Sequence, residues 1–429
     1  MSDLIYNISD KPKTIREWVL YAIQQVLAVF VATVLIATIC KTPVDACLIG
    51  ACIGTIIYQL ITGFKSPIFI SSCGATVSAV CGAMALGAVY PNYLAVVIGG
   101  AVIAVVYTIF ALVVKKSGIF AINKLFPPTI VGAVTMVIGL NLATFIPTYV
   151  QINNQSNNVG VLIAIATMLV VAIASHYFKG FWKTIPFLIG LVFGYIVSLI
   201  ITLCTSVKVV DLSKFENMRI FSIPDFTFLH WADNEISWSV VGQVLMLFIP
   251  VAICALLEHY SDHKVLSNII GTDLTEKPGL HRTLIGDGVA SFVGTIVCGL
   301  PNTSYGESIA TVGFSRVASV SVMTLSALML GAMAFISPIQ ALIASIPSCV
   351  FGGCAIILYG YIAASGLKTL MNNHVDLENN KNLLVVCAVL TVGVSGIFLF
   401  SQSFAGVSLA MVIGVLLNLV LREKERKIA

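Results

Sequence analysis

The segments SSCGAT (residues 71–76) and TSYGES (residues 303–308) interrupt two apolar runs with small and polar residues. Each would make a poor lipid-facing helix, and non-helical backbone at membrane depth persists only where it lines a cavity or is buried in protein. The segments lie at matching places in the two halves of the chain, in the third and the tenth apolar run. Paired broken segments of this kind indicate the substrate site of an inverted-repeat transporter. Plain helix packing by Gly and Ser is the alternative.

The composition of the chain predicts a membrane protein. Its 429 residues are 58% hydrophobic and only 10% charged, whereas soluble domains carry about 25% charged residues. Lipid must therefore cover much of the apolar surface. The net charge of +4 is too small to indicate nucleic acid as a partner. None of the 11 cysteines forms a CxxC pair, so we expect no disulfide framework, no metal site and no cofactor.

Apolar runs of the length of a membrane-spanning helix, about 20 residues, follow one another along the chain. Our best count is fourteen, with seven on each side of a polar stretch, which predicts an all-α polytopic membrane protein. The runs of the first half are 18–40, 44–62, 67–88, 93–114, 127–147, 159–177 and 183–204. Those of the second half are 238–258, 284–300, 302–315, 317–337, 339–366, 382–400 and 404–421.

The Lys and Arg residues predict the orientation of these runs. With a cytoplasmic N-terminus, all but four of the 23 basic residues fall in the tails or in inside loops, the exceptions being Lys41, Lys208, Lys214 and Arg219. We therefore expect a multi-pass protein of the cell (inner) membrane with both termini in the cytoplasm. Its expected parts are a cytoplasmic tail 1–17, a first repeat 18–204, an extracytoplasmic loop 205–237, a second repeat 238–421 and a cytoplasmic tail 422–429.

Two carboxylates follow the apolar run 244–257, and ionisable residues in spans are candidates for a functional site. Glu258 and Asp262 are four residues apart, so they share a helix face if the helix continues. The segment 243–270 contains no Gly, and its only Pro is Pro250. We predict one long helix that carries this acidic face into a cavity, with a solvated helix end as the alternative.

Glu307 is the second candidate, since it follows Gly306 with no basic residue before Arg316; a loop carboxylate near the outer surface is the alternative. Carboxylates accept hydrogen bonds from the N–H groups of a planar, amide-rich ligand, and backbone N–H groups of a broken span donate to its carbonyls. Two glutamates therefore suit a pyrimidine better than an anion, which requires Arg, Lys or bare helix N-termini. Asp287 lies between two glycines, and we expect it to cap a helix start rather than to serve the site.

With these residues the chain resembles the nucleobase–ascorbate transporter family over nearly its whole length, and within it the bacterial uracil permeases. The most specific match to the family signature is PNTSYGESIATVGFSR at 301–316. Other segments similar to the family are QQVLAVFVATVL at 24–35, LFPPTIVGAVTMVIGL at 125–140, PGLHRTLIGDG at 278–288 and AIILYGYIAASG at 355–366.

The resemblance implies fourteen spans in two inverted repeats of seven, with a short strand in the third and in the tenth span. Spans one to four and eight to eleven would form a core domain. Spans five to seven and twelve to fourteen would form a gate domain, through which the protein would form a homodimer. Substrate would bind between the two strands. The implied substrate-binding residues are Glu258 and Glu307 through their carboxylates, Cys73 and Gly306 through their backbone, and Tyr305 and Tyr359 as walls of the pocket.

The chain departs from the uracil permeases at several of these positions. Asp262 stands where those permeases have a His, and His263 points about 100° away from it on a helix. Cys73 stands where they have a Phe in the third-span strand, so an aromatic wall is missing. Ser308, Ala310 and Ser315 replace an Asn, a Gly and a Thr of the signature. These departures bear on the substrate and on proton coupling, not on the fold.

We therefore expect proton-coupled symport of a nucleobase, with uracil as the leading substrate, into the cell. Glu258 or Asp262 would take the coupling proton. One alternative is a permease for xanthine, urate or guanine, although purine members of the family often carry Gln where Glu307 stands. Another is an anion transporter of the same fold, although the acidic residues of the candidate site disfavour an anion as the substrate. We expect no enzyme, because the sequence contains neither an HExxH nor a GxSxG pattern.

Overall fold

The computed structural model describes residues 4–86, 90–118, 127–151, 158–205, 207–215, 220–231, 236–399 and 401–421. Within these residues, eight helices are long and apolar enough to cross a membrane, by length and composition. They are α1 (Ile15–Cys40), α2 (Val44–Thr62), α4 (Tyr93–Ser117), α6 (Pro128–Ala143) continued by α7 (Ile146–Tyr149), α8 (Asn158–Tyr177), α9 (Pro186–Cys204), α10 (Trp238–Ile270) and α15 (Ser348–Asn372).

Shorter elements complete the described part of the chain. The remaining helices are α3 (Val77–Met84), α11 (Leu280–Cys298), α12 (Gly306–Ser315), α13 (Val320–Met333), α14 (Ser337–Ser345), α16 (Asn380–Val394) and α17 (Val407–Val420). The strands are β1 (Ile70–Ser72), β2 (Asn302–Ser304), β3 (Phe398–Leu399) and β4 (Ser401–Ala405). Single turns form η1 (Gly74–Thr76), η2 (Gly180–Thr184), η3 (Leu212–Phe215), η4 (Thr227–His230) and η5 (Thr275–Gly279).

Each of the two broken segments of the sequence begins in a short strand, as the resemblance implies, and the two strands pair with each other. β1 and β2 are antiparallel, with Ile70 opposite Ser304 and Ser72 opposite Asn302. All residues of both strands are buried. Since buried backbone groups need partners, this pairing is what allows extended backbone inside the molecule. The Asn302 side chain anchors β2 by donating to the carbonyl oxygens of Gly50 (3.0 Å) and Ala290 (3.3 Å).

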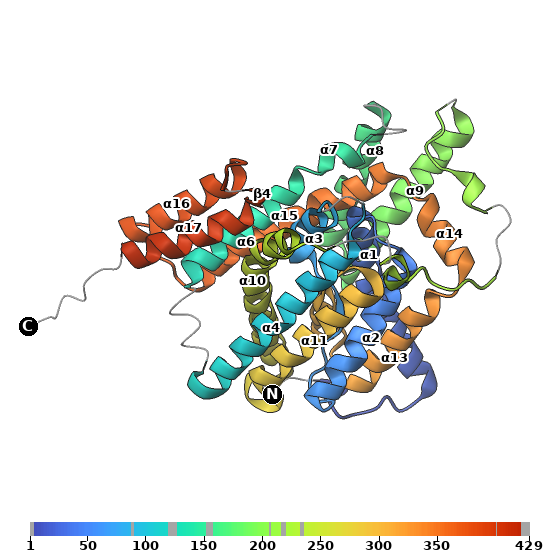
Figure 1. The fold of residues 1–429 in the computed structure, drawn as a ribbon. Helices are drawn as coiled ribbons and strands as arrows, with labels where there is room; N and C mark the ends of the chain where they lie inside the picture. Colours follow the sequence, from blue (N-terminus) through green and yellow to red (C-terminus); the bar gives the residue numbers. More distant parts are fainter. Residues whose placement is uncertain are drawn as a thin grey trace, which may run out of the picture.

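The helices lie in two neighbouring groups (Figure 1). In one group α11 packs against α2 and α4, and α13 packs against α1 and α2. In the other, α15 packs against α6 and α8, and α16 packs against α6 and α17. α10 contacts α4 of the first group and α17 of the second. A residue on α10 is therefore well placed to take part in a site between the groups.

α10 runs without interruption through Pro250 to Ile270, which confirms one long helix and rules out an end at Glu258. The loop after it is fastened by Asp273, which accepts hydrogen bonds from Thr275 Oγ1 (2.6 Å) and Lys264 Nζ (2.9 Å). These hydrogen bonds, first from Thr275 and then from Lys264, lower the pKa of the Asp273 carboxyl to about 2. The loop therefore keeps this charged link at any physiological pH.

The N-terminal segment packs on the loop that follows α12. Ile5 N donates to the Arg316 carbonyl oxygen (2.8 Å), and Ala318 N donates to that of Tyr6 (2.9 Å). Tyr6 is buried, and its hydroxyl donates to Glu17 (2.8 Å). α1 accordingly begins at Ile15, earlier than the expected run at 18–40.

Other expected boundaries also differ from the structure. The run 339–366 is divided into α14 and α15, because Pro347 stands at the N-cap of α15 and interrupts the helix. In place of a single run at 382–400, α16 ends at Val394 and the β3–β4 hairpin follows. The tail 422–429 lies outside the described residues.

Candidate functional site

A cavity of about 640 Å³ lies beside α10, β2, the start of α12, η1 and α15. Glu258, Asp262 and Glu307 all line it. The structure therefore brings together the three carboxylates that the sequence singled out. A separate cavity of about 470 Å³ lies between the N-terminal segment, α1 and α13. Its lining is mainly apolar and its one titratable residue is Lys11, so we place the site in the larger cavity.

The two glutamates face the cavity from different elements. Glu258 lies on α10 and is exposed to the cavity, and Glu307 lies in the first turn of α12 and is half-buried. No described side chain donates a hydrogen bond to either carboxylate. The first N–H groups of α12 have no acceptor within the helix, and Tyr305 at the N-cap supplies no side-chain cap. Hydrogen-bond acceptors and donors thus stand side by side at one end of the cavity.

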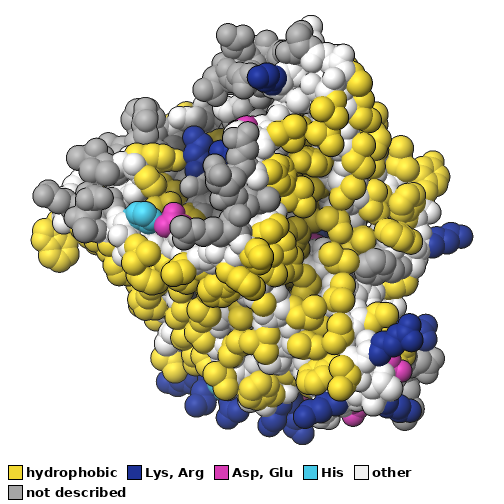
Figure 2. Space-filling model, turned by 90° about the vertical axis from the view of Figure 1, so that its right-hand side faces the viewer, with side chains coloured by type: hydrophobic (Ala, Val, Ile, Leu, Met, Phe, Trp, Pro, Cys, Tyr) yellow, Lys and Arg dark blue, Asp and Glu magenta, His cyan; other side chains and the backbone are white. Residues whose placement is uncertain are grey.

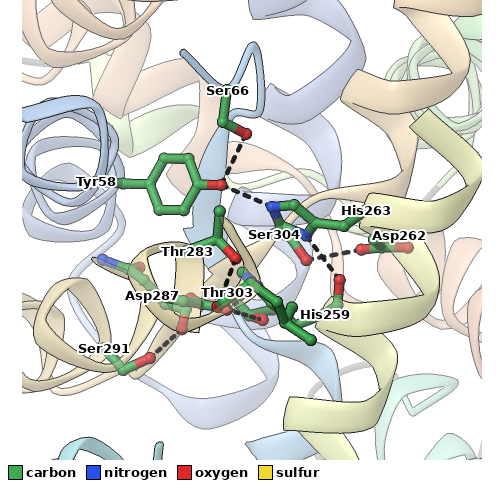
Figure 3. Close-up of polar contacts among 12 residues, drawn as sticks. Tyr58, Ser66, His259, Asp262, His263, Thr283, Asp287, Ser291, Thr303 and Ser304 are labelled. Carbon is green, nitrogen blue, oxygen red and sulfur yellow. Dashed lines mark hydrogen bonds and ion pairs between the residues drawn. The ribbon is translucent and has the colours of Figure 1, made fainter. Parts of the chain in front are cut away.

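Asp262 shares the cavity-facing side of α10 with Glu258, as the spacing predicted. Its Oδ2 accepts a hydrogen bond from Ser304 Oγ (2.7 Å), which joins α10 to β2 (Figure 3). Since β2 leads directly into α12, this hydrogen bond ties α10 to the strand that precedes Glu307.

Two of the expected site residues are not among the described residues that line the cavity, namely Cys73 and Tyr359. The Cys73 N–H donates to the Pro301 carbonyl oxygen (2.8 Å), so it serves the β1–β2 pair in this structure. Tyr359 is 2% exposed and points into the core. Tyr361 lines the cavity instead, because two residues along a helix turn the side chain by about 200°.

The remaining expected residues lie at the cavity. Gly306 and Tyr305 both line it. Gly74 and Ala75, directly after Cys73, line it from the side of η1. Two exposed lysines, Lys183 and Lys368, also line it. Both lysines belong to loops that the sequence predicts to be cytoplasmic, so the cavity extends from the carboxylates toward that predicted side.

The expectation that Asp287 caps a helix start is wrong. Asp287 lies inside α11 and is fully buried. Its Oδ2 accepts a hydrogen bond from Thr303 Oγ1 (3.1 Å) and lies 2.6 Å from His259 Nδ1. The contact with His259 is close enough for an ion pair when the imidazole is protonated, but its angles are not those of a hydrogen bond.

A second buried histidine lies next to this pair (Figure 3). The rings of His259 and His263 are 4.1 Å apart between centroids, and both side chains are fully buried. His263 Nε2 lies 2.7 Å from Tyr58 Oη, and Tyr58 Oη lies 2.8 Å from Ser66 Oγ. The sequence did carry a signal for the two histidines, because the spacing of four residues puts them on one face of α10.

The acidic and the histidine faces of α10 therefore lie on two sides of β2. Glu258 and Asp262 face the cavity, whereas His259 and His263 face α2 and α11. Among the described residues, no group of three or more His, Cys, Asp or Glu side chains is arranged to hold a metal ion.

Known proteins resemble this chain along nearly all of its length. The model of a permease family matches residues 16–402. A uracil permease of Bacillus caldolyticus is 36% identical over 427 residues, which cover 98% of this chain and 95% of the relative. A uracil permease of Bacillus subtilis (strain 168) is 34% identical and that of Escherichia coli (strain K12) 30% identical. These matches cover 98% and 97% of this chain, and 96% and 94% of the two relatives.

Solved structures with a similar fold are much more distant in sequence. The transmembrane domain of a cyanobacterial bicarbonate transporter, BicA, has a TM-score of 0.62 at 14% identity, with 95% of this chain and 98% of that chain covered. Murine solute carrier 26 family member A9, an anion transporter in the inward-facing state, has a TM-score of 0.63 at 12% identity, with 96% and 69% covered. These likenesses concern the fold alone. On the sequence matches, the chain belongs to the nucleobase–ascorbate transporter family of multi-pass membrane permeases.

Proposed function

We propose that this permease carries a nucleobase, uracil before others, into the cell in symport with a proton. The observation that carries the proposal is the pair of glutamates, Glu258 and Glu307, which face one cavity and accept no hydrogen bond from any described side chain. The names of the relatives, uracil permeases at 30–36% identity over nearly the full length, support the same substrate.

The chemistry of uracil matches the groups that line this end of the cavity. Its ring presents N–H donors and C=O acceptors in alternation. Carboxylates accept from the N–H groups, and the first N–H groups of α12, which have no acceptor within the helix, can donate to a carbonyl. An anion would instead meet three carboxylates, Glu258, Asp262 and Glu307, at close range. The arrangement therefore favours a neutral base.

For the proton, we propose Asp262 and Glu258 as carriers within the cavity. A charged carboxylate is costly to expose to lipid-like surroundings, and protonation removes that charge. Asp262 is bonded to Ser304 on β2, so its protonation would change the strand that leads into the substrate-binding helix α12. Glu258 has no such link and would bind the base directly.

We infer fourteen membrane segments in two inverted repeats of seven. The eight long helices account for part of this number, and β1 with α3, β2 with α12, α11, α13, α16 and α17 would supply the rest. The antiparallel pairing of β1 with β2 supports an inverted relation between the two halves. The helix group around α2, α4 and α11 would form the core domain, and that around α6, α15 and α16 the gate domain and the homodimer contact.

We further propose that residues 1–17 and 422–429 are cytoplasmic and that residues 205–237 lie outside. Figure 2 shows a largely apolar face, with most of its visible Lys and Arg side chains along the lower edge. This edge is at the end of the molecule where Figure 1 places the N-terminus. The positive-inside rule assigns such an edge to the cytoplasm.

The substrate is tested by competition in cells that express the protein and lack their own uptake system. Unlabelled uracil, thymine, cytosine, xanthine, urate, guanine and bicarbonate compete with labelled uracil. We expect uracil to compete best and the purines weakly. Stronger competition by xanthine or guanine would overturn the pyrimidine assignment, and competition by bicarbonate would favour the anion transporters that share the fold.

A further inference from the structure

The two nitrogens of the buried His263 have partners of different kinds. Nδ1 lies 2.7 Å from the carbonyl oxygen of His259, which only accepts hydrogen bonds. Nε2 lies 2.7 Å from the hydroxyl of Tyr58, which can donate or accept. Nδ1 therefore carries a hydrogen whether or not the ring is charged, and the second proton of the imidazolium belongs on Nε2.

This arrangement satisfies His263 in both of its protonation states. When the ring is neutral, the hydroxyl of Tyr58 donates to Nε2, 2.7 Å away. When Nε2 binds a proton, it donates to Tyr58 Oη, and the hydroxyl of Tyr58 turns to donate to Ser66 Oγ. Only hydrogens change place between the two states. A histidine that serves packing alone has no need of a hydroxyl partner that can turn in this way.

The titratable groups around His263 come from several elements. Tyr58 faces it from α2 and Asp287 from α11, and His259 lies beside it on α10. Tyr107 of α4 packs against His259 on the far side of that ring. The other charged groups of α10 point elsewhere, since Glu258 lines the cavity, Asp262 accepts from Ser304 and Lys264 donates to Asp273. The buried carboxylate of Asp287 is thus placed to offset a charge on the two histidines.

Tyr58 and Ser66 connect His263 with the exposed α2–β1 connection. Ser66 is buried, but it follows Phe64 and Lys65, which are exposed in the α2–β1 connection. The same connection leads into β1, which pairs with β2. A change in the hydrogen bonds of Tyr58 and Ser66 therefore affects the β1–β2 pair through the α2–β1 connection, while Asp262 contacts the pair from the side of the cavity.

We propose that His263 is a proton-binding site of the transport cycle, with the Tyr58 hydroxyl turning from Nε2 to Ser66 Oγ when the proton binds. It is separate from the cavity carboxylates and does not touch the base, so it is a positioning residue. The inference rests on the proposed proton symport.

The variants that test this are Tyr58→Phe and His263→Gln, in the full-length protein. Tyr58→Phe removes one hydroxyl and keeps the ring, so packing is preserved even if His263→Gln folds poorly. Tyr195→Phe is the matched control, because Tyr195 forms a similar hydroxyl pair with Ser345 (3.0 Å), far from the histidines. Each protein is purified in detergent, and part of each preparation is reconstituted in liposomes.

Two measurements distinguish a coupling role from a structural one. The first is proton uptake on addition of uracil to the purified protein, read with a pH indicator in weakly buffered solution. The second is uracil exchange without a pH gradient, measured across a range of pH and compared with gradient-driven accumulation. We expect His263→Gln to lower proton uptake and to reduce accumulation about tenfold, with exchange retained within about twofold. We expect Tyr58→Phe to move the exchange profile about one unit to lower pH, a tenfold loss of proton affinity.

The outcomes separate this inference from the proposed function. If Tyr58→Phe and His263→Gln take up protons and accumulate uracil as the wild type and Tyr195→Phe do, His263 is only a packed core residue and the inference fails alone. If the wild-type protein itself binds uracil without proton uptake, and its accumulation of uracil does not depend on the pH gradient, the proposed symport is wrong and this inference is wrong with it.

Discussion

Glu307 illustrates how two levels of structure place one carboxylate in the cavity. Its place in the first turn of α12 puts a carboxylate beside backbone N–H groups that have no acceptor within the helix. Its place after β2 directs the same turn toward the cavity that Glu258 enters from α10. A loop carboxylate at the outer surface, the alternative reading of the sequence, would not share a cavity with a residue in the middle of α10.

We expect Glu307→Gln to weaken uracil binding by roughly 1.5–3 kcal/mol, the usual contribution of a hydrogen bond to a charged group. The side chains are isosteric, so expression and folding should change little. Equilibrium binding to the purified protein measures the effect. Glu276→Gln is the control, because Glu276 is exposed in η5, away from the cavity. Unchanged uracil binding in Glu307→Gln would make this residue a bystander.

Glu258 and Asp262 should separate binding from coupling. We expect Glu258→Gln to damage uracil binding itself, since its carboxylate faces the cavity and has no hydrogen-bond donor among the described side chains. We expect Asp262→Asn to impair proton-driven accumulation more than exchange, since Asp262 is bonded to β2 through Ser304. Uptake and exchange in proteoliposomes, with and without an imposed pH gradient, measure both. Normal concentration of uracil by Asp262→Asn under the gradient would exclude this residue from coupling.

At the residue scale the sequence identified the cavity carboxylates but not the buried polar residues behind them. Carboxylates in or beside apolar runs are easy to recognise in a sequence. The spacing of four residues between Glu258 and Asp262 predicts that both lie on one face of the helix. Asp287 was misread because it stands between two glycines, which suggests a turn. The structure shows what the glycines do. A Cβ at Gly286 would lie 3.0 Å from the Tyr58 ring, and one at Gly288 would lie 2.9 Å from Tyr107 Cβ, so they permit close packing within a helix.

At the scale of elements, the broken segments were predicted as strands, but their pairing was not. Pairing depends on which backbone groups lie opposite each other in space, and β1 and β2 are far apart in the sequence. The length of α10 could be predicted, since the absence of Gly permits a continuous helix. The division between α14 and α15 was missed because hydropathy continues across Pro347, while helix geometry does not.

The packing of α6 against α15 depends on glycines at the contact. A Cβ at Gly366 would lie 2.4 Å from the carbonyl oxygen of Gly132 and 2.6 Å from Met136 N, both backbone atoms that cannot move aside separately. We expect Gly366→Ala to lower the free energy of unfolding by roughly 1–3 kcal/mol, as overpacking does. Thermal unfolding in detergent measures it.

Gly360→Ala on the same helix provides the matched control. A Cβ there meets nothing within 4 Å, so the gain in helix propensity, up to about 1 kcal/mol, should make it neutral or stabilising. Equal unfolding temperatures for Gly366→Ala and Gly360→Ala would contradict the close contact between α6 and α15.

For the whole molecule, composition and hydropathy predicted a multi-pass membrane protein, and the sequence relatives confirm the permease family. The arrangement of the helices in two groups joined by α10 could not be read from hydropathy. A run of apolar residues shows that a segment can enter lipid, but not which neighbour it packs against. Contacts such as α2 with α11 and α6 with α15 follow instead from glycines and side-chain shapes that a single sequence does not place in space.

The orientation of the molecule is open to a direct test. We expect both termini to be cytoplasmic, because a cytoplasmic N-terminus places nearly all Lys and Arg residues in the tails and inside loops. A reporter that is active on one side of the membrane, fused in turn to each end, decides this. A periplasmic or external signal from either end would refute an even number of spans with the N-terminus inside.

The central claim is that the cavity of Glu258 and Glu307 couples uracil movement to a proton gradient. The most direct measurement is uptake of labelled uracil into liposomes that contain only this protein, with the outside made acidic relative to the inside. We expect uracil to accumulate above its external concentration while the gradient lasts, and to leave when a protonophore collapses it. Uptake that merely equilibrates, with the same extent with and without the gradient, would contradict the claim.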